Sequence, residues 1–167
     1  IMLVKKRFLT HDEVQGQVNN IIRHLQKHRI HPGAIVGITR GGLTPAVMMS
    51  HYFNCPLLVL DYSLRDRDEA SLNDAATDHV VNRISEVINN TKHVIIVDDI
   101  NDSGETLQGI KNLFLDELFS DAYIVYAALL EKSTSRFDCD FYGEMLMDEQ
   151  CNDWIVFPWE DWWFNKS

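Results

Sequence analysis

The chain has few cysteines, no long apolar run and no excess of basic side chains, and each shortage excludes a class of protein. Its only cysteines are Cys55, Cys139 and Cys151, which are far apart and never spaced as CxxC. A disulfide framework or a thiolate zinc site is therefore not expected, and a reducing cytoplasm is the expected location. No apolar segment approaches the length of a membrane span, and the first residues lack the apolar core of a signal peptide.

The charge balance is acidic, with 15 Lys and Arg against 25 Asp and Glu and a net charge of −10. Nonspecific binding to nucleic acid or to a membrane needs a basic surface, so neither is an expected partner. A small anionic ligand remains compatible, because a few local donors and a metal ion reverse the sign inside one pocket. The 167 residues contain no repeat or Pro/Gly/Ser-rich linker, so a single domain over 1–167 is expected.

Short apolar runs alternate with amphipathic patterns along the chain. The runs predict buried strands and the amphipathic spacing predicts helices. Strands are expected at 34–39, 57–60, 93–97, 123–130 and 154–157. Helices are expected over 14–25, from Thr44-Pro45, over 80–88, and from Ser103 through Leu118. We further expect a capping box at Thr10 and Glu13, a helix stop at Pro32-Gly33, and a surface loop over 61–78.

This alternation predicts an α/β fold with a mainly parallel sheet and helices on both faces. Ligands of such sheets bind outside the carboxyl ends of the strands. The segments after Thr39, Val97 and Leu130 are therefore the candidate binding segments.

The segment after Val97 carries the richest chemistry, reading DDINDSGET over residues 98–106. Gly104 permits a tight turn with positive φ, and the N–H groups of 103–106 at a helix start form a cradle for phosphate. The hydroxyls of Ser103 and Thr106 add donors. Side chains of neighbouring strand residues face opposite ways, so Asp98 and Asp99 serve one ligand only if the strand ends there.

Carboxylates beside a phosphate cradle need a reason, because a carboxylate about 4 Å from a phosphate repels it by roughly 4 kcal/mol at an effective dielectric near 20. A divalent cation and ligand hydroxyls that donate to Asp98 or Asp99 remove the conflict. A phosphorylated ribose with bound Mg²⁺ fits this description. A polar turn with acidic residues at a helix cap is the alternative that uses no ligand.

Other phosphate and metal motifs fail by position. An EF-hand loop starting at Asp99 would have Ile110 where glutamate is required. The chain has no GxxxxGK[ST] and no GxGxxG, which excludes a nucleotide-triphosphatase loop and a dinucleotide fold. His24 and His28 lie one helical turn apart but lack the glutamate of a zincin motif, so no metal site is expected there.

Residues 95–107 read IIVDDINDSGETL and resemble the central motif of the type I phosphoribosyltransferases, especially members that act on 6-oxopurines. The resemblance implies that Asp98 and Asp99 handle the ribose hydroxyls and Mg²⁺. It implies that Asp102 exchanges a proton with N7 of the base. The loop that holds the 5-phosphate would comprise Asp102, Ser103, Gly104, Glu105 and Thr106.

Three other segments resemble the family in order and spacing. Residues 37–45, GITRGGLTP, resemble its pyrophosphate loop, which implies binding by Arg40 and by the N–H groups of Gly41 and Gly42. Residues 129–132, LLEK, match the strand end whose lysine, here Lys132, donates to O6 of the purine.

The tail 154–160, WIVFPWE, resembles that of bacterial and archaeal purine members. This match implies that Trp154 stacks on the base, that backbone groups at Ile155 read its edge, and that Glu160 lies near pyrophosphate and metal. Residues after Leu60, including Arg65, match the family poorly. The aromatic residues 159 and 162–164 are expected to pack onto the sheet or to form a subunit contact, and binding of base or protein is the alternative.

The resemblance implies an enzyme with a core over about 34–135 and a small hood built from both chain ends. Its expected reaction transfers the 5-phosphoribosyl group of 5-phosphoribosyl-1-pyrophosphate (PRPP) to N9 of guanine, xanthine or hypoxanthine, with Mg²⁺ as cofactor. Family members are usually homodimers or homotetramers. A non-catalytic sensor of PRPP or nucleotide, or a transferase for another base, remains the alternative.

Overall fold

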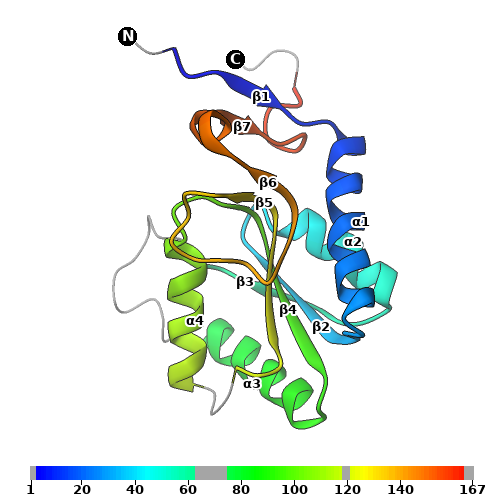
Figure 1. The fold of residues 1–167 in the computed structure, drawn as a ribbon. Helices are drawn as coiled ribbons and strands as arrows, with labels where there is room; N and C mark the ends of the chain where they lie inside the picture. The colour runs from blue at the N-terminus through cyan, green and yellow to red at the C-terminus, as the bar shows by residue number, and fades with distance from the viewer. Residues whose placement is uncertain (1–2, 63–74, 118–120, 164–167) are drawn as a thin grey trace.

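The structure is a computed structural model that describes residues 3–62, 75–117 and 121–163. Arg65, most of the expected 61–78 loop, Leu118 and Phe164 lie outside the described residues. The elements follow in the order shown in Figure 1: β1 (Lys6–Phe8), α1 (His11–Lys27), β2 (Pro32–Ile38), α2 (Leu43–Phe53), β3 (Leu57–Leu60), α3 (Ala75–Asn89), β4 (His93–Asn101), α4 (Glu105–Glu117), β5 (Ile124–Lys132), β6 (Phe141–Leu146), η2 (Asp148–Asn152) and β7 (Trp154–Val156).

Five strands form a parallel sheet in the order β3-β2-β4-β5-β6. In Figure 1, α1 and α2 lie on one side of this sheet, and α3 and α4 lie on the other. Side chains of the central strand alternate between the two sides: Val94 and Ile96 belong to one buried cluster, Ile95 and Val97 to the other. The predicted α/β class with helices on both faces is confirmed.

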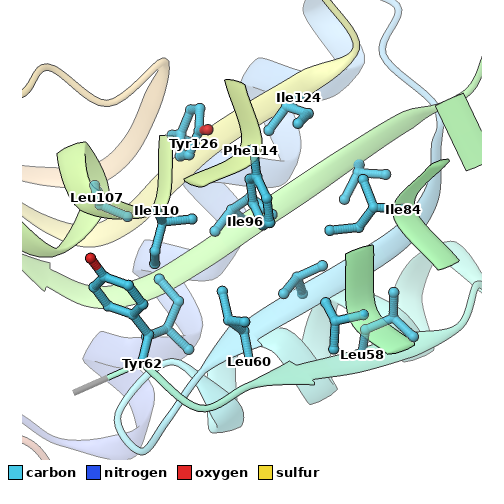
Figure 2. Packing of buried hydrophobic residues seen from close by; sticks show 14 of the residues in the cluster. Leu58, Leu60, Tyr62, Ile84, Ile96, Leu107, Ile110, Phe114, Ile124 and Tyr126 are labelled. Carbon is cyan, nitrogen blue, oxygen red and sulfur yellow. The ribbon is translucent and has the colours of Figure 1, made fainter. Parts of the chain in front are cut away.

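Two apolar layers hold the helices to the sheet. Figure 2 shows the layer under α3 and α4, where Phe114 and Ile84 pack against Ile96 and Leu60 of the sheet. These side chains are almost fully buried. Burial of each side chain stabilises the folded state by about 1.5–3 kcal/mol. The two layers together therefore hold the strand ends on which the site is built.

Helix α1 begins as predicted but ends differently. The Thr10 side chain accepts from the Glu13 N–H and the Glu13 carboxylate accepts from the Thr10 N–H, which confirms the capping box. The helix ends at Lys27, five residues before Pro32, so the predicted stop is wrong. Arg29 takes a left-handed conformation with φ 56, its N–H donates to Gln26, and the next N–H donates to Leu25. This Schellman motif ends the helix.

Several other boundaries differ from the prediction. Helix α2 begins at Leu43 with Gly42 as its cap, one residue before the expected start at Thr44, and Pro45 is its third residue. Helix α3 begins at Ala75, which makes the last residues of the expected loop helical. Helix α4 begins at Glu105 rather than near Ser103. Strand β4 continues to Asn101, so the prediction that it ends at the acidic pair is wrong. Strands β1 and β6 had no counterpart among the predicted elements.

Strands β1 and β7 form a separate two-stranded parallel sheet, in which Arg7 is the register partner of Ile155. Figure 1 shows it beyond one end of the main sheet. The Arg7 guanidinium donates to both Glu144 carboxylate oxygens, at 2.8 and 3.1 Å, and Gln17 donates to the same carboxylate at 3.2 Å. These contacts tie the small sheet to β6 and α1.

None of the helices in the described ranges is both long and apolar enough to cross a bilayer.

The ion pair between Arg7 and Glu144 predicts a pH-dependent contribution to stability. Hydrogen bonding from Arg7 lowers the pKa of Glu144, so the ion pair stabilises the fold above the ordinary glutamate pKa of about 4.3. The contribution is lost as pH falls through the lowered folded-state pKa. Because the side chains are 28% and 35% exposed, solvent screening limits it. We expect Glu144→Gln to lower the free energy of unfolding by about 0.5–1 kcal/mol near neutral pH.

Urea unfolding at about pH 7 and about pH 3 measures this difference. It should shrink toward zero at the lower pH, and the exposed Glu149→Gln should change stability little at either pH. An equal loss at both pH values would contradict the ionic origin of the contact.

Candidate active site

A cavity of about 940 Å³ opens between the carboxyl end of the main sheet and the β1–β7 sheet. It is lined from the β2–α2 loop, the end of β4, the start of α4, and β7 with the residues after it. Among the predicted site residues it brings together Arg40, Gly41, Asp98, Asp99, Thr106, Trp154, Ile155 and Glu160.

Asp98 and Asp99 both line this cavity although β4 continues past them. The alternation of side chains is interrupted here, because Val97 and Ile100 pack on the same side of the sheet despite being three residues apart. Each carboxylate also accepts from the next backbone N–H, at 2.8 Å in both cases. Strand β2 pairs with β4 only as far as Val97, so beyond it this edge of β4 faces the cavity.

The acidic pair lies in an environment that disfavours its negative charge. Burial raises the pKa of Asp98 well above its ordinary value, and the neighbouring Asp99 carboxylate raises it further. Burial also raises the pKa of Asp99, and the charge of Glu160 adds to this effect. A bound cation or hydroxyl donors would stabilise the ionised pair, which is the chemistry expected of a magnesium and sugar site.

The described residues contain no group of three or more His, Cys, Asp or Glu arranged to hold a metal. Glu160 accepts from the N–H of Phe157 at 2.9 Å and so closes its own turn. Mg²⁺ is commonly bound through one or two carboxylates together with substrate phosphates and water. Asp98 and Asp99, which both line the cavity, fit the carboxylate part of that pattern.

The loop between β2 and α2 approaches the acidic pair closely. The Thr39–Arg40 peptide bond is cis, and Arg40 is exposed at the cavity wall. A β carbon added at Gly41 would overlap the Asp99 carboxylate. The N–H of Gly42 donates to the Ile38 carbonyl at 2.9 Å, and this residue does not line the cavity. Arg40 and Gly41 therefore face the cavity, whereas Gly42 does not.

The loop between β4 and α4 makes the turn expected of a phosphate cradle. Gly104 has φ 89, and a β carbon there would lie 2.6 Å from the Phe137 nitrogen, so glycine is required for both reasons. The Ser103 hydroxyl accepts from the Glu105 N–H at 3.3 Å and caps the helix. The Glu105 side chain is exposed, whereas Thr106 lines the cavity. The other residues of the cradle, Ser103, Gly104 and Glu105, do not line the cavity.

Asp102 and Lys132 meet directly at the same edge of the sheet. They follow Asn101 and Glu131, which are register partners on β4 and β5. The Lys132 ammonium lies 2.8 Å from the Asp102 carboxylate, and the lysine side chain is 10% exposed against 66% for the aspartate. Neither residue lines the large cavity. A carboxylate and an ammonium in contact can receive a flat ring that has an N–H group beside a carbonyl oxygen.

Aromatic side chains cover the cavity from the β7 side. Trp154 lies on β7 with 62% of its surface exposed, and it lines the cavity. Trp159 also lines it while its ring stacks on Phe157, with centroids 4.9 Å apart and planes at 8°. The lining also includes Lys6 and Trp163. Lys6 was missed because β1 is too short to be recognised in sequence. For Trp159 and Trp163, packing or a subunit contact was the preferred expectation and binding of base or protein the alternative.

Residues 6–160 match the family model of the phosphoribosyl transferase domain. The chain belongs to the phosphoribosyltransferase family. A xanthine-guanine phosphoribosyltransferase of Gluconobacter oxydans is 30% identical over 142 residues, covering 81% of this chain and 73% of that protein. Another, from Cereibacter sphaeroides, is 29% identical over 131 residues, covering 76% and 68%.

Solved phosphoribosyltransferase structures agree with the fold. The purine phosphoribosyltransferase of Pyrococcus horikoshii superposes with a TM-score of 0.68 at 26% identity, covering 97% of this chain and 99% of that one. The Helicobacter pylori xanthine-guanine-hypoxanthine phosphoribosyltransferase gives 0.67 at 19% identity, covering 93% and 94%, which supports the fold alone. The resemblance drawn from residues 95–107 and the expectation of a transferase are thereby confirmed.

Proposed function

We propose that this phosphoribosyltransferase transfers the 5-phosphoribosyl group of PRPP to N9 of guanine, xanthine or hypoxanthine. The products are the nucleoside monophosphate and pyrophosphate, as in purine salvage. The observation that carries the proposal is the 2.8 Å contact between Asp102 and Lys132 beside the acidic pair of β4. A 6-oxopurine has an N–H group at N7 next to its O6, which matches this acceptor and donor. The named relatives, both xanthine-guanine phosphoribosyltransferases, support the same substrate class.

The sugar half of the substrate would bind along β4 and α4. Asp98 and Asp99 accept hydrogen bonds from the ribose hydroxyls. The N–H groups of 103–106, the Thr106 hydroxyl and the helix dipole bind the 5-phosphate. Arg40 and the N–H of Gly41 bind the pyrophosphate.

Phosphoribosyltransferases generally need Mg²⁺, and we propose that Asp98 and Asp99 hold it here, with Glu160 close to the same position. When bound, Mg²⁺ neutralises charge between the pyrophosphate and these carboxylates. The raised pKa values of the pair support this assignment, because buried like charges are favourable only when compensated.

The base would bind between the strand ends and the β1–β7 sheet. Trp154 stacks on the purine ring, and backbone groups at Ile155 read its edge. In this arrangement β1 and β7 are the hood of a single domain whose core spans about 34–135. Binding the base separates Asp102 from Lys132, so each exchanges a partner within the protein for one on the purine.

Catalysis then follows from charge placement. As the bond from the ribose anomeric carbon to pyrophosphate breaks, positive charge develops on the sugar and negative charge on the leaving group. Arg40 stabilises the leaving group, and the Asp98 and Asp99 carboxylates lie near the ribose. N9 attacks the anomeric carbon while the N7 proton passes to the Asp102 carboxylate. Alignment of base and sugar supplies much of the remaining acceleration.

Lys132→Ala is expected to raise KM for the base by about 10- to 100-fold, since a hydrogen bond to a charged group contributes about 1.5–3 kcal/mol. KM for PRPP should stay nearly constant, because Lys132 is proposed to donate to the base and not to PRPP. Lys111→Ala is the matched control, since it removes a lysine that pairs with Asp121 at 3.6 Å away from the site. Steady-state kinetics with each substrate varied in turn make the comparison. Unchanged base kinetics in Lys132→Ala would remove its assignment to O6.

The proposed reaction is tested by incubating the protein with Mg²⁺, PRPP and one purine at a time, and separating the products by chromatography. Guanine, xanthine or hypoxanthine should give the monophosphate. Adenine has an amine where these bases have O6, so it presents a donor to the Lys132 donor and should react far more slowly. Absence of nucleotide with every purine would overturn the proposal.

We also propose that the protein forms a homodimer or homotetramer. The support is a group of exposed apolar side chains on α2 and β3, namely Val47, Tyr52 and Val59, which are 40%, 55% and 47% exposed. Light scattering coupled to size-exclusion chromatography gives the mass in solution, and a monomer would contradict this proposal.

A further inference from the structure

A second polar pair lies directly behind Asp102 and Lys132. Asn101 and Glu131 are register partners on the adjacent parallel strands β4 and β5, and each side chain is 2% exposed. The Asn101 amide donates to the Glu131 carboxylate at 2.9 Å. One residue further along the chain, Lys132 at the end of β5 and Asp102 just after β4 are 2.8 Å apart. Two cross-strand pairs therefore follow each other, the first buried and the second at the site.

The buried pair is poorly suited to stabilising the fold. One Glu131 carboxylate oxygen accepts from Asn101 and, at 3.4 Å, from the Cys139 N–H, while the other has no hydrogen-bond partner. A buried oxygen without a partner costs folding free energy, and an apolar pair of the same shape is often at least as stable. What this pair supplies instead is geometry.

The strand ends need such a constraint because the alternation of side-chain directions is interrupted just before them, although β4 and β5 keep one register as far as Asn101 and Glu131. On β4, Val97 and Ile100 pack on the same side, and on β5 the consecutive Leu129 and Leu130 do so as well. Alternation alone therefore does not fix the direction of the side chains that follow. β4 has also left its partner β2 by this point.

Asn101 links three segments at this position. Its amide donates both to Glu131 on β5 and to the Phe137 carbonyl at 2.5 Å, in the segment after β5. Both acceptors are long-range in sequence, at 30 and 36 residues. The amide thus holds the end of β4 against the end of β5 and against the chain that covers it.

We propose that Asn101 and Glu131 are positioning residues that set the separation of Asp102 and Lys132, and with it the recognition of the purine N7 and O6 edge. They do so from the buried side and without touching the substrate. This inference rests on the proposed purine transfer.

The test compares four variants. Glu131→Leu removes the acceptor at similar volume, Asn101→Ala removes the donor, and Glu131→Gln keeps an oxygen that can accept from Asn101. Val125→Ala, a buried change on the same strand β5, is the control for lost stability without a change at the pair.

Glu131→Leu and Asn101→Ala are expected to lower kcat/KM for the base by about 10- to 100-fold, the effect of a misplacement of about 1 Å. The Kd for PRPP should remain within about twofold, and Glu131→Gln should recover most of the activity. Val125→Ala should leave base kinetics unchanged at a comparable loss of thermal stability. The inference is overturned if Glu131→Leu and Asn101→Ala weaken PRPP binding as much as they lower kcat/KM for the base. It is also overturned if Val125→Ala lowers kcat/KM for the base by the same factor.

A readout independent of activity separates this inference from the proposed function. A double-mutant cycle of Asp102→Ala and Lys132→Ala, read by thermal stability, should give a measurable coupling energy in the native chain. The same cycle should give no coupling energy in a chain that also carries Glu131→Leu or Asn101→Ala. If the native protein converts no purine, the proposed function fails, and the positioning claim is decided by this cycle. The positioning claim is overturned if the Asp102–Lys132 coupling energy is the same in the native, Glu131→Leu and Asn101→Ala chains.

Discussion

Asp102→Asn is expected to lower kcat by about 10²- to 10⁴-fold, the contribution of a positioned general base. Asparagine keeps the size of the side chain and one oxygen that accepts a hydrogen bond, but it takes up no proton from N7. Asp102 is 66% exposed, so the substitution should leave the fold intact. Binding of PRPP should change little, because the amides of residues 103–106 remain in place.

Steady-state kinetics with hypoxanthine or guanine, together with calorimetry for PRPP, separate the two effects. Asp116→Asn, an exposed change on α4, is the control and should have native kinetics. A variant at Asp102 with native kcat would remove the general-base assignment. A variant whose PRPP affinity fell as much as its kcat would instead assign Asp102 to the sugar site.

The double substitution Asp98→Asn, Asp99→Asn should have opposite effects on function and stability. It should reduce kcat/KM for PRPP by about 100-fold or more, since two hydrogen bonds to charged groups of about 1.5 kcal/mol each are lost. Without substrate or Mg²⁺, however, the variant should be more stable than the native protein near neutral pH. The cause is burial, which raises the pKa of both carboxyls in the folded state.

The sign follows from proton linkage. A carboxyl whose folded pKa is raised binds its proton more tightly in the folded than in the unfolded chain. The free energy of unfolding therefore falls as pH rises above the ordinary aspartate pKa of about 3.9, and the penalty is complete above the raised value. In the double variant the free energy of unfolding should not show this fall with rising pH. Urea unfolding at several pH values with EDTA, repeated with Mg²⁺ and PRPP, should show ligand stabilisation only for the native chain. A variant that is less stable throughout, with native PRPP affinity, would contradict the assignment.

The fold was predictable where burial determines the sequence pattern. The consecutive apolar residues 94–97 predict a strand covered on both faces, and the Thr10–Glu13 box marks a helix start, because both depend on local chemistry. The end of α1 was not predictable, because its Schellman motif uses Arg29 in the left-handed conformation rather than glycine. Strand β6 is only partly buried and contains Gly143 and Glu144, so it lacks the apolar run that marks the central strands.

The candidate site was predictable as separate segments but not as an arrangement. Motif resemblance assigned Asp102 and Lys132 individually, but their contact depends on the register of β4 against β5, which sequence spacing does not encode. Placement of both aspartates on one cavity despite a continuing strand depends on the interrupted alternation at Val97 and Ile100, a tertiary effect. Lys6 joins the cavity only because β1 pairs with β7, at the opposite end of the chain.

The most direct measurement of the central claim is isothermal titration calorimetry of PRPP into the native protein, with and without Mg²⁺. The account predicts saturable binding that strengthens with Mg²⁺ and disappears in the Asp98→Asn, Asp99→Asn variant. A native protein that binds neither PRPP nor any purine mononucleotide in the presence of Mg²⁺ would contradict it.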